Sequence, residues 1–161
     1  MKASDLFVKC LEAEGVTKIF GIPGEENADL MISLKKSKIE FVLCRHEQAA
    51  AFMADVYGRL TGKAGVCLAT LGPGVTNLMT GLADANMDRA PVVAIIGQGS
   101  TERLHKESHQ IMDSISMVAP ISKWAQTILS AKNVTEVVRK AFKVAETEKP
   151  GVTVIELPED V

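Results

Sequence analysis

The chain has 161 residues, which suits one compact domain at roughly 100–200 residues per domain. Hydrophobic residues make up 47% and charged residues 24%, a balance typical of a globular protein with a sizeable core. The formal net charge is -2, and no run of lysine or arginine is long enough for a nucleic-acid groove, so we expect no nucleic acid as a partner. No apolar run approaches the roughly 18 residues of a membrane span, so we expect no membrane either.

Helical and strand patterns alternate along the whole sequence. Apolar residues recur at helical spacing between Ser4 and Gly15, and further helices are predicted over residues 27–36, 46–61, 73–87 and 134–147. Strands are predicted over residues 17–20, 39–44, 64–70, 92–97, 121–126 and 152–157. About six strands with helical crossovers indicate an α/β fold with a doubly wound parallel sheet, flavodoxin-like, with helices on both faces.

The irregular stretch of residues 98–113 is polar and follows a nearly continuous apolar strand. Open parallel sheets bind ligands at the carboxyl ends of their strands. The glycine turns that follow Phe20 and Thr70 fall at the same edge, so three loops are expected to converge on one site.

The segment from Leu71 to Asn77 joins a buried strand to a helix and contains Gly72, Pro73 and Gly74. Loop amides and a helix amino terminus could cradle a phosphate there. Pro73 has no amide hydrogen, however, and the Gly-Lys-Ser/Thr ending of phosphate loops is missing. A tight turn, or the close approach of a flat ligand, are the alternatives.

Glu47 begins the third predicted helix and shares a helical face with small residues, among them Ala50, Ala51 and Ala54. A small-residue stripe implies that something packs closely over it. If that face is buried, the carboxylate needs a specific partner. The alternative is an exposed first-turn glutamate that interacts favourably with the helix dipole.

Two histidines, His105 and His109, could place two imidazoles on one helical face, as in some metal sites. Only Glu107 or Asp113 could add a carboxylate ligand, so hydrogen-bonding histidines in a polar loop are favoured and no metal site is predicted.

The three cysteines, Cys10, Cys44 and Cys67, are dispersed among apolar neighbours, which favours reduced thiols over disulfides or a zinc site. The amino terminus has no signal-peptide pattern. A cytoplasmic location is the expectation.

Four motifs together are more specific than any one alone. They are Gly21-Ile22-Pro23-Gly24, Arg45-His46-Glu47-Gln48-Ala49-Ala50, Gly72-Pro73-Gly74-Val75-Thr76-Asn77 and the segment from Pro91 to Gln98. In order and spacing, the chain resembles the amino-terminal, pyrimidine-binding domain of thiamine diphosphate enzymes related to acetolactate synthase. The resemblance covers residues 1–161, and His109 to Asp113 is most similar to the catabolic, flavin-independent members.

The resemblance implies that Glu47 hydrogen-bonds the N1′ nitrogen of the thiamine diphosphate aminopyrimidine, and so activates the cofactor to attack a 2-oxo acid such as pyruvate. Decarboxylation and addition to a second oxo acid would give an acetohydroxy acid. Pro73, Gly74 and Asn77 would lie against the pyrimidine, and Gln110 and Gly24 would face substrate. The small face of Ala50, Ala51 and Ala54 would pair with another domain.

In that family the diphosphate and its Mg²⁺ are bound by a separate domain, marked by a Gly-Asp-Gly motif that does not occur here. The resemblance therefore implies a fragment of a longer chain, inactive when isolated. It also implies a diphosphate-binding domain or subunit as partner, and a homo-oligomer, a dimer or tetramer in the full enzyme. FAD stays an open alternative.

Two other functions fit the sequence. One is a free-standing pyrimidine-domain subunit of a 2-oxo acid decarboxylase of the sulfopyruvate decarboxylase type. The other is a noncatalytic flavodoxin-like binding module.

Overall fold

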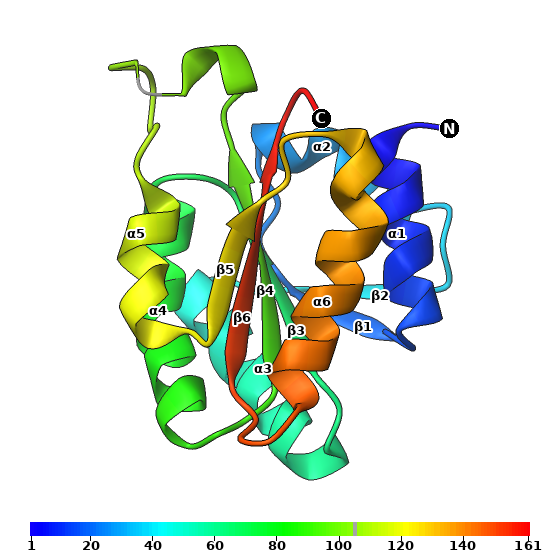
Figure 1. The fold of residues 1–161 in the computed structure, drawn as a ribbon, viewed down its shortest axis with the longest axis vertical. Helices are drawn as coiled ribbons and strands as arrows, with labels where there is room; N and C mark the ends of the chain where they lie inside the picture. Colours follow the sequence, from blue (N-terminus) through cyan, green and yellow to red (C-terminus); the bar gives the residue numbers. More distant parts are fainter. Residues whose placement is uncertain (105) are drawn as a thin grey trace.

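One parallel sheet of six strands forms the centre of the molecule within residues 1–104 and 106–161, which the computed structural model describes. The strands are β1 (Lys18–Gly21), β2 (Glu40–Leu43), β3 (Gly65–Ala69), β4 (Val92–Gln98), β5 (Trp124–Thr127) and β6 (Val152–Pro158). Their spatial order is β2-β1-β3-β4-β6-β5, and every neighbouring pair is parallel. The predicted doubly wound α/β fold is confirmed (Figure 1).

Helices cover both faces of this sheet (Figure 1). The helices are α1 (Ala3–Ala13), α2 (Ala28–Leu34), α3 (Glu47–Thr61), α4 (Pro73–Met87), α5 (Ser114–Val118) and α6 (Val134–Glu146). Helices α1, α2 and α6 pack on one face, and α3, α4 and α5 pack on the other. Within the described ranges, none of them is both long and apolar enough to cross a lipid bilayer.

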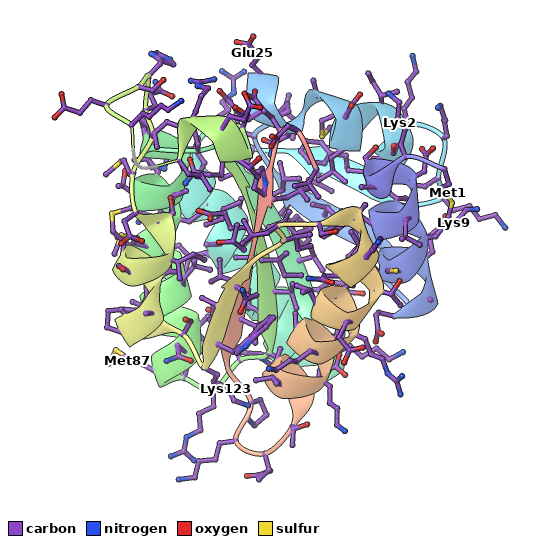
Figure 2. The ribbon with its side chains drawn as sticks, turned by 45° about the horizontal axis from the view of Figure 1, so that its top comes forward. Met1, Lys2, Lys9, Glu25, Met87 and Lys123 are labelled. Atoms are coloured by element: carbon purple, nitrogen blue, oxygen red, sulfur yellow. The ribbon has the colours of Figure 1, made fainter. Side chains whose placement is uncertain are left out.

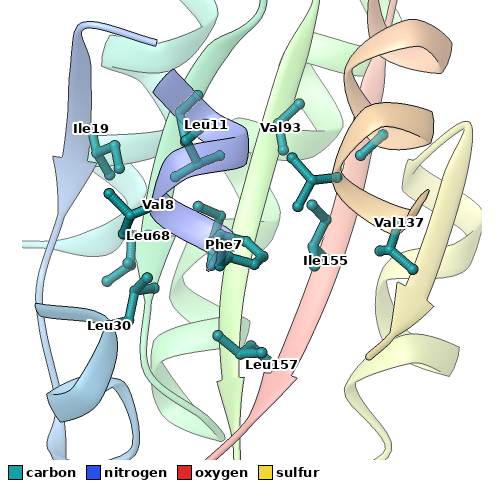
Figure 3. Packing of buried hydrophobic residues seen from close by; sticks show 14 of the residues in the cluster. Phe7, Val8, Leu11, Ile19, Leu30, Leu68, Val93, Val137, Ile155 and Leu157 are labelled. Carbon is teal, nitrogen blue, oxygen red and sulfur yellow. The ribbon is translucent and has the colours of Figure 1, made fainter. Parts of the chain in front are cut away.

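Large apolar side chains fill the layer under α1 and α6. Phe7 and Leu11 of α1 are fully buried and belong to one cluster with Leu68 of β3 and Val93 of β4 (Figure 3). Successive side chains of a strand point to opposite faces of the sheet. Cys67, which precedes Leu68 in β3, therefore belongs to a second cluster on the opposite face. Both faces of the central strands are therefore buried, which explains their nearly continuous apolar sequences.

Small side chains fill the opposite layer and let α3 approach α4 closely. Ala50, Ala51 and Ala54 are completely buried within the chain itself. Gly81 of α4 packs directly on Ala51, because a Cβ at position 81 would lie 2.6 Å from the Ala51 Cβ. The prediction that this small face pairs with another domain is wrong, since the face is used for packing between two helices of the same chain.

The strand order reverses between β1 and β3, which are neighbours in the sheet although β2 lies between them in sequence. Such a switch point is where open parallel sheets bind ligands, at the carboxyl ends of the strands. Figure 2 brings this edge forward: Glu25, which follows β1, lies at this end of the molecule, and Met87 and Lys123 lie at the opposite end.

The region before β5 differs from the prediction. A short helix, α5, was not predicted, and β5 begins at Trp124 rather than near residue 121. Asp113 caps α5, because its Oδ1 accepts a hydrogen bond from the Ser116 amide at 3.0 Å. The 3₁₀ turn η3 (Ala119–Ile121) follows, and the extended backbone can start only after it.

Candidate functional site

Glu47 is the first residue of α3 and is only 9% exposed. The helix starts here because His46, in extended conformation, caps it: its Nδ1 accepts a hydrogen bond from the Gln48 amide at 3.1 Å. The alternative of an exposed first-turn glutamate is therefore excluded. Burial of a carboxylate requires a specific partner.

That partner is Asn77, on the second turn of α4. Its Nδ2 donates a hydrogen bond to Glu47 Oε2 at 2.9 Å. Among the described residues, no donor forms a hydrogen bond with the other oxygen, Oε1. In that part of the chain every buried side-chain oxygen has a hydrogen-bond partner, so an oxygen without one cannot be buried. Oε1 is therefore open to the surface. Glu47 is thus held by one oxygen and can form a further hydrogen bond with the other.

The turn between β3 and α4 is closed by its own backbone hydrogen bonds. The amides of Gly74, Val75 and Thr76 donate to the carbonyl oxygens of Leu71 and Gly72, at 3.0 to 3.1 Å. Pro73 occupies the first helical turn, where its missing amide hydrogen costs nothing. These amides are already used, so the phosphate cradle is excluded and the tight turn is the observed structure.

Gln110 lies directly against this turn. Gly72 has a φ of 53°, and a Cβ at that position would lie 2.8 Å from both the Cβ and the carbonyl oxygen of Gln110. Gln110 itself has a φ of 56° and is exposed. The segment that follows β4 therefore folds back over the turn that follows β3, as the convergence of loops predicts.

Gly24 joins the same edge through Thr70. A Cβ at position 24 would lie 2.4 Å from Thr70 Oγ1, and that hydroxyl donates to Glu26 Oε2 at 2.8 Å. Thr70 and Glu26 also belong to this edge, although the sequence pattern did not predict them. Only their positions in the sequence could have indicated them: Thr70 ends the apolar run before Gly72, and Glu26 follows the first glycine turn.

The predicted site residues thus form two groups at one end of the sheet. Glu47 and Asn77 are joined by a hydrogen bond between the starts of α3 and α4. Gly24, Gly74 and Gln110 gather around the turn after β3: the first two contact Thr70, and Gln110 contacts Gly72. Pro73 is exposed on that turn.

Comparison with known proteins identifies the family of the chain. The family model "Thiamine pyrophosphate enzyme, N-terminal TPP binding domain" matches residues 1–117. The chain belongs to this family.

Among curated relatives of this thiamine pyrophosphate enzyme domain, the catabolic acetolactate synthase of Raoultella terrigena is 45% identical over 158 residues, covering 98% of this chain. A probable acetolactate synthase large subunit of Methanocaldococcus jannaschii is 43% identical over 161 residues and 100% of the chain. The acetolactate synthase of Bacillus subtilis is 41% identical over 160 residues and 99% of the chain. The chain spans only 27–28% of the length of these relatives.

The arrangement of Glu47 and Asn77 fits a ring nitrogen of thiamine pyrophosphate. A ring nitrogen needs one oriented hydrogen-bonding group, and Glu47 Oε1 is open while Asn77 fixes Oε2. Gly72 and Gly74 also serve packing within the chain, because an added Cβ would lie 2.8 Å from Gln110 at position 72 and 3.1 Å from Thr70 Cγ2 at position 74.

No metal-binding cluster of three or more His, Cys, Asp or Glu residues occurs in the part of the chain that the structure describes. His105, one of the two histidines considered for a metal site, lies outside the described residues, and His109 is exposed.

Proposed function

We propose that this chain is the pyrimidine-binding domain of an acetolactate synthase and that Glu47 activates thiamine diphosphate there. The observation that carries this proposal is the pairing of Glu47 with Asn77, which buries the carboxyl group and leaves one oxygen open. The names of three relatives at 41–45% identity support the reaction class.

Glu47 acts by holding a proton between its Oε1 and the ring nitrogen N1′ of the aminopyrimidine. Asn77 fixes Oε2, so the carboxyl group keeps one orientation while the proton moves. Thiamine diphosphate supplies, when bound, the nucleophilic carbon that attacks the carbonyl of a 2-oxo acid such as pyruvate and allows carbon dioxide to leave. Only 9% of Glu47 is exposed, and the low polarity of such surroundings strengthens the hydrogen bond on which this activation depends.

We assign the remaining site residues by their positions around the turn. Pro73, Gly74 and Asn77 would bound the pyrimidine ring, with Pro73 exposed toward it. Gln110, exposed above Gly72, and Gly24, across the turn, would face the 2-oxo acid.

The partner would be a diphosphate-binding domain or subunit, which would also hold Mg²⁺. The outward face of α3 and α4 supports such a partner. Met53, Val56 and Leu60 form an exposed apolar stripe on α3, and Met87 at the end of α4 is 81% exposed. Large exposed apolar residues on neighbouring helices are typical of protein interfaces. A longer polypeptide that assembles into a homo-oligomer would cover this face.

We also infer a cytoplasmic location. All three cysteines, Cys10, Cys44 and Cys67, are free thiols, which supports a reducing compartment.

The relatives favour this function over a decarboxylase subunit or a noncatalytic module, because all three are named as acetolactate synthases.

A chimera tests the proposed function: this chain replaces the 158 matching residues of the Raoultella terrigena enzyme. With thiamine diphosphate, Mg²⁺ and pyruvate, we expect acetolactate as product. A chimera that folds and assembles but releases only acetaldehyde, or no product, would contradict the proposal.

A further inference from the structure

Gln98, the last residue of β4, closes the base of a long loop. It is 2% exposed, and its Oε1 accepts a hydrogen bond from the Gly99 amide at 3.0 Å. Its Nε2 donates to the carbonyl oxygen of Met112, also at 3.0 Å. One side chain therefore binds the first and the last residues of segment 99–112, which carries Gln110.

Glu156 of β6 holds Gln98 in place. It is 3% exposed, and its Oε1 accepts a second hydrogen bond from Gln98 Nε2 at 3.0 Å. Its Oε2 accepts a hydrogen bond from Thr127 Oγ1 of β5 at 2.6 Å. Three neighbouring strands, β4, β5 and β6, thus contribute one residue each to a buried polar network.

This network fixes the half of the loop that carries Gln110. The first half is tied elsewhere, because the Ser100 amide donates to Glu159 and the Thr101 amide donates to Asp160. Among residues 104 and 106–112, the only hydrogen bond to the sheet is the one that Gln98 Nε2 donates to the Met112 carbonyl oxygen. That contact therefore ties the half of the loop that carries Gln110 to the sheet.

The surroundings explain why hydrogen bonds are needed. A cleft of about 580 Å³ lies beneath the segment, and its apolar lining includes Leu104, Ile111 and Met112. Apolar contact has no direction, so it alone would let the segment settle in several ways. Directional hydrogen bonds in a buried site select one arrangement.

We propose that Gln98 and Glu156 are positioning residues that place Gln110 against Gly72 and thereby set the fit of the 2-oxo acid. The effect on substrate rests on the proposed function, whereas the effect on loop position does not.

Amide hydrogen exchange by NMR, on this 17.3 kDa protein, tests the loop position. Gln98→Met keeps the side-chain length and removes both of its hydrogen-bonding groups. Because these buried hydrogen bonds are lost, we expect exchange at Gly99 and Ile111 to become about tenfold or more faster. Glu156→Gln still accepts from Gln98 and should exchange at the parent rate. Gln126→Ala, an exposed change on β5, is the matched control.

The same variants in the chimera test the substrate effect. Gln98→Met should raise the KM for pyruvate about tenfold with the affinity for thiamine diphosphate unchanged. The conservative variant Glu156→Gln, which keeps an acceptor for Gln98, should keep the parent KM. Parent-like exchange at Gly99 and Ile111 in Gln98→Met would overturn the positioning role. Faster exchange with an unchanged KM would overturn the link to substrate. If the unsubstituted chimera makes no acetolactate but exchange still responds, the proposed function fails and the positioning of the loop stands.

Discussion

Asn77 Nδ2 lies 2.9 Å from Glu47 Oε2, so the second turn of α4 holds the first residue of α3. These two residues are 30 positions apart in the chain, and the contact exists because Gly81 lets α4 pack closely on Ala51. The small-residue layer, the helix spacing and the orientation of the carboxyl group are therefore parts of one arrangement.

Removal of the Asn77 amide should destabilise the protein. Asn77→Ala leaves the buried Glu47 Oε2 without its donor, and the free energy of unfolding should fall by about 1–3 kcal/mol. Urea denaturation followed by far-UV circular dichroism measures this. Thr80→Ala, an exposed change on the same helix, should stay within about 0.5 kcal/mol of the parent. Equal stability of Asn77→Ala and Thr80→Ala would show that the hydrogen bond contributes nothing.

Gly72 should tolerate a side chain less well than Gly62, although both have positive φ angles of 53° and 69°. Nothing lies within 4 Å of a Cβ at Gly62, so Gly62→Ala should cost only the backbone strain, about 1–2 kcal/mol. Gly72→Ala adds a clash with Gln110 and should cost about 1–3 kcal/mol more. Thermal unfolding compares the two. A smaller loss for Gly72→Ala would mean that Gln110 does not rest on this turn.

The pH dependence of stability should report on Glu156. Burial, with Asp113 nearby, raises the pKa of this carboxyl group above its ordinary value of 4.5, although Thr127 and Gln98 oppose the shift. A raised pKa in the folded state favours the neutral form, so its stabilising effect is complete below about pH 4.5 and is lost as pH rises through the folded pKa.

Glu156→Gln carries no titrating proton, so it separates this effect from other groups. Its free energy of unfolding relative to the parent should be most favourable at pH 7 and should decrease as pH falls toward 4.5. Urea denaturation across this range measures the difference. A difference that does not change with pH would mean that the pKa of Glu156 is not raised by folding.

Substitutions on the outward face of α3 should weaken assembly rather than folding. Val56→Asp places a charge in the exposed apolar stripe, and in the chimera we expect a lower fraction of assembled enzyme by analytical ultracentrifugation. Ile32→Asp, an equally exposed position on α2 at the opposite face of the sheet, is the control. The same assembled fraction in both variants would assign the partner to another surface.

The sequence predicted the sheet well because its signals are local. The segments 65–69 and 92–97 are nearly continuous apolar runs, as expected of parallel strands that are buried on both faces. Helix α5 was missed because it spans only Ser114–Val118 and depends on a cap from Asp113, which is too short a pattern to show periodicity.

The partners of the site residues were harder to predict than the residues themselves. The stripe beside Glu47 indicated close packing, but a pattern on one helix does not say what packs on it, and Gly81 is 30 positions away from Ala51. Likewise Gln98 and Glu156 are separated by 58 positions and meet only because β6 lies next to β4. Such contacts are products of topology.

Substitution of Glu47 by glutamine in the chimera tests the account most directly. Glutamine keeps the size and the contact with Asn77 but cannot hold a proton for the ring nitrogen, so the rate of acetolactate formation should fall roughly 10²–10⁴-fold while the melting temperature stays near that of the parent. Glu136→Gln, the first-turn glutamate of α6, should leave the rate unchanged. Parent-like turnover by the Glu47→Gln chimera would contradict the central claim.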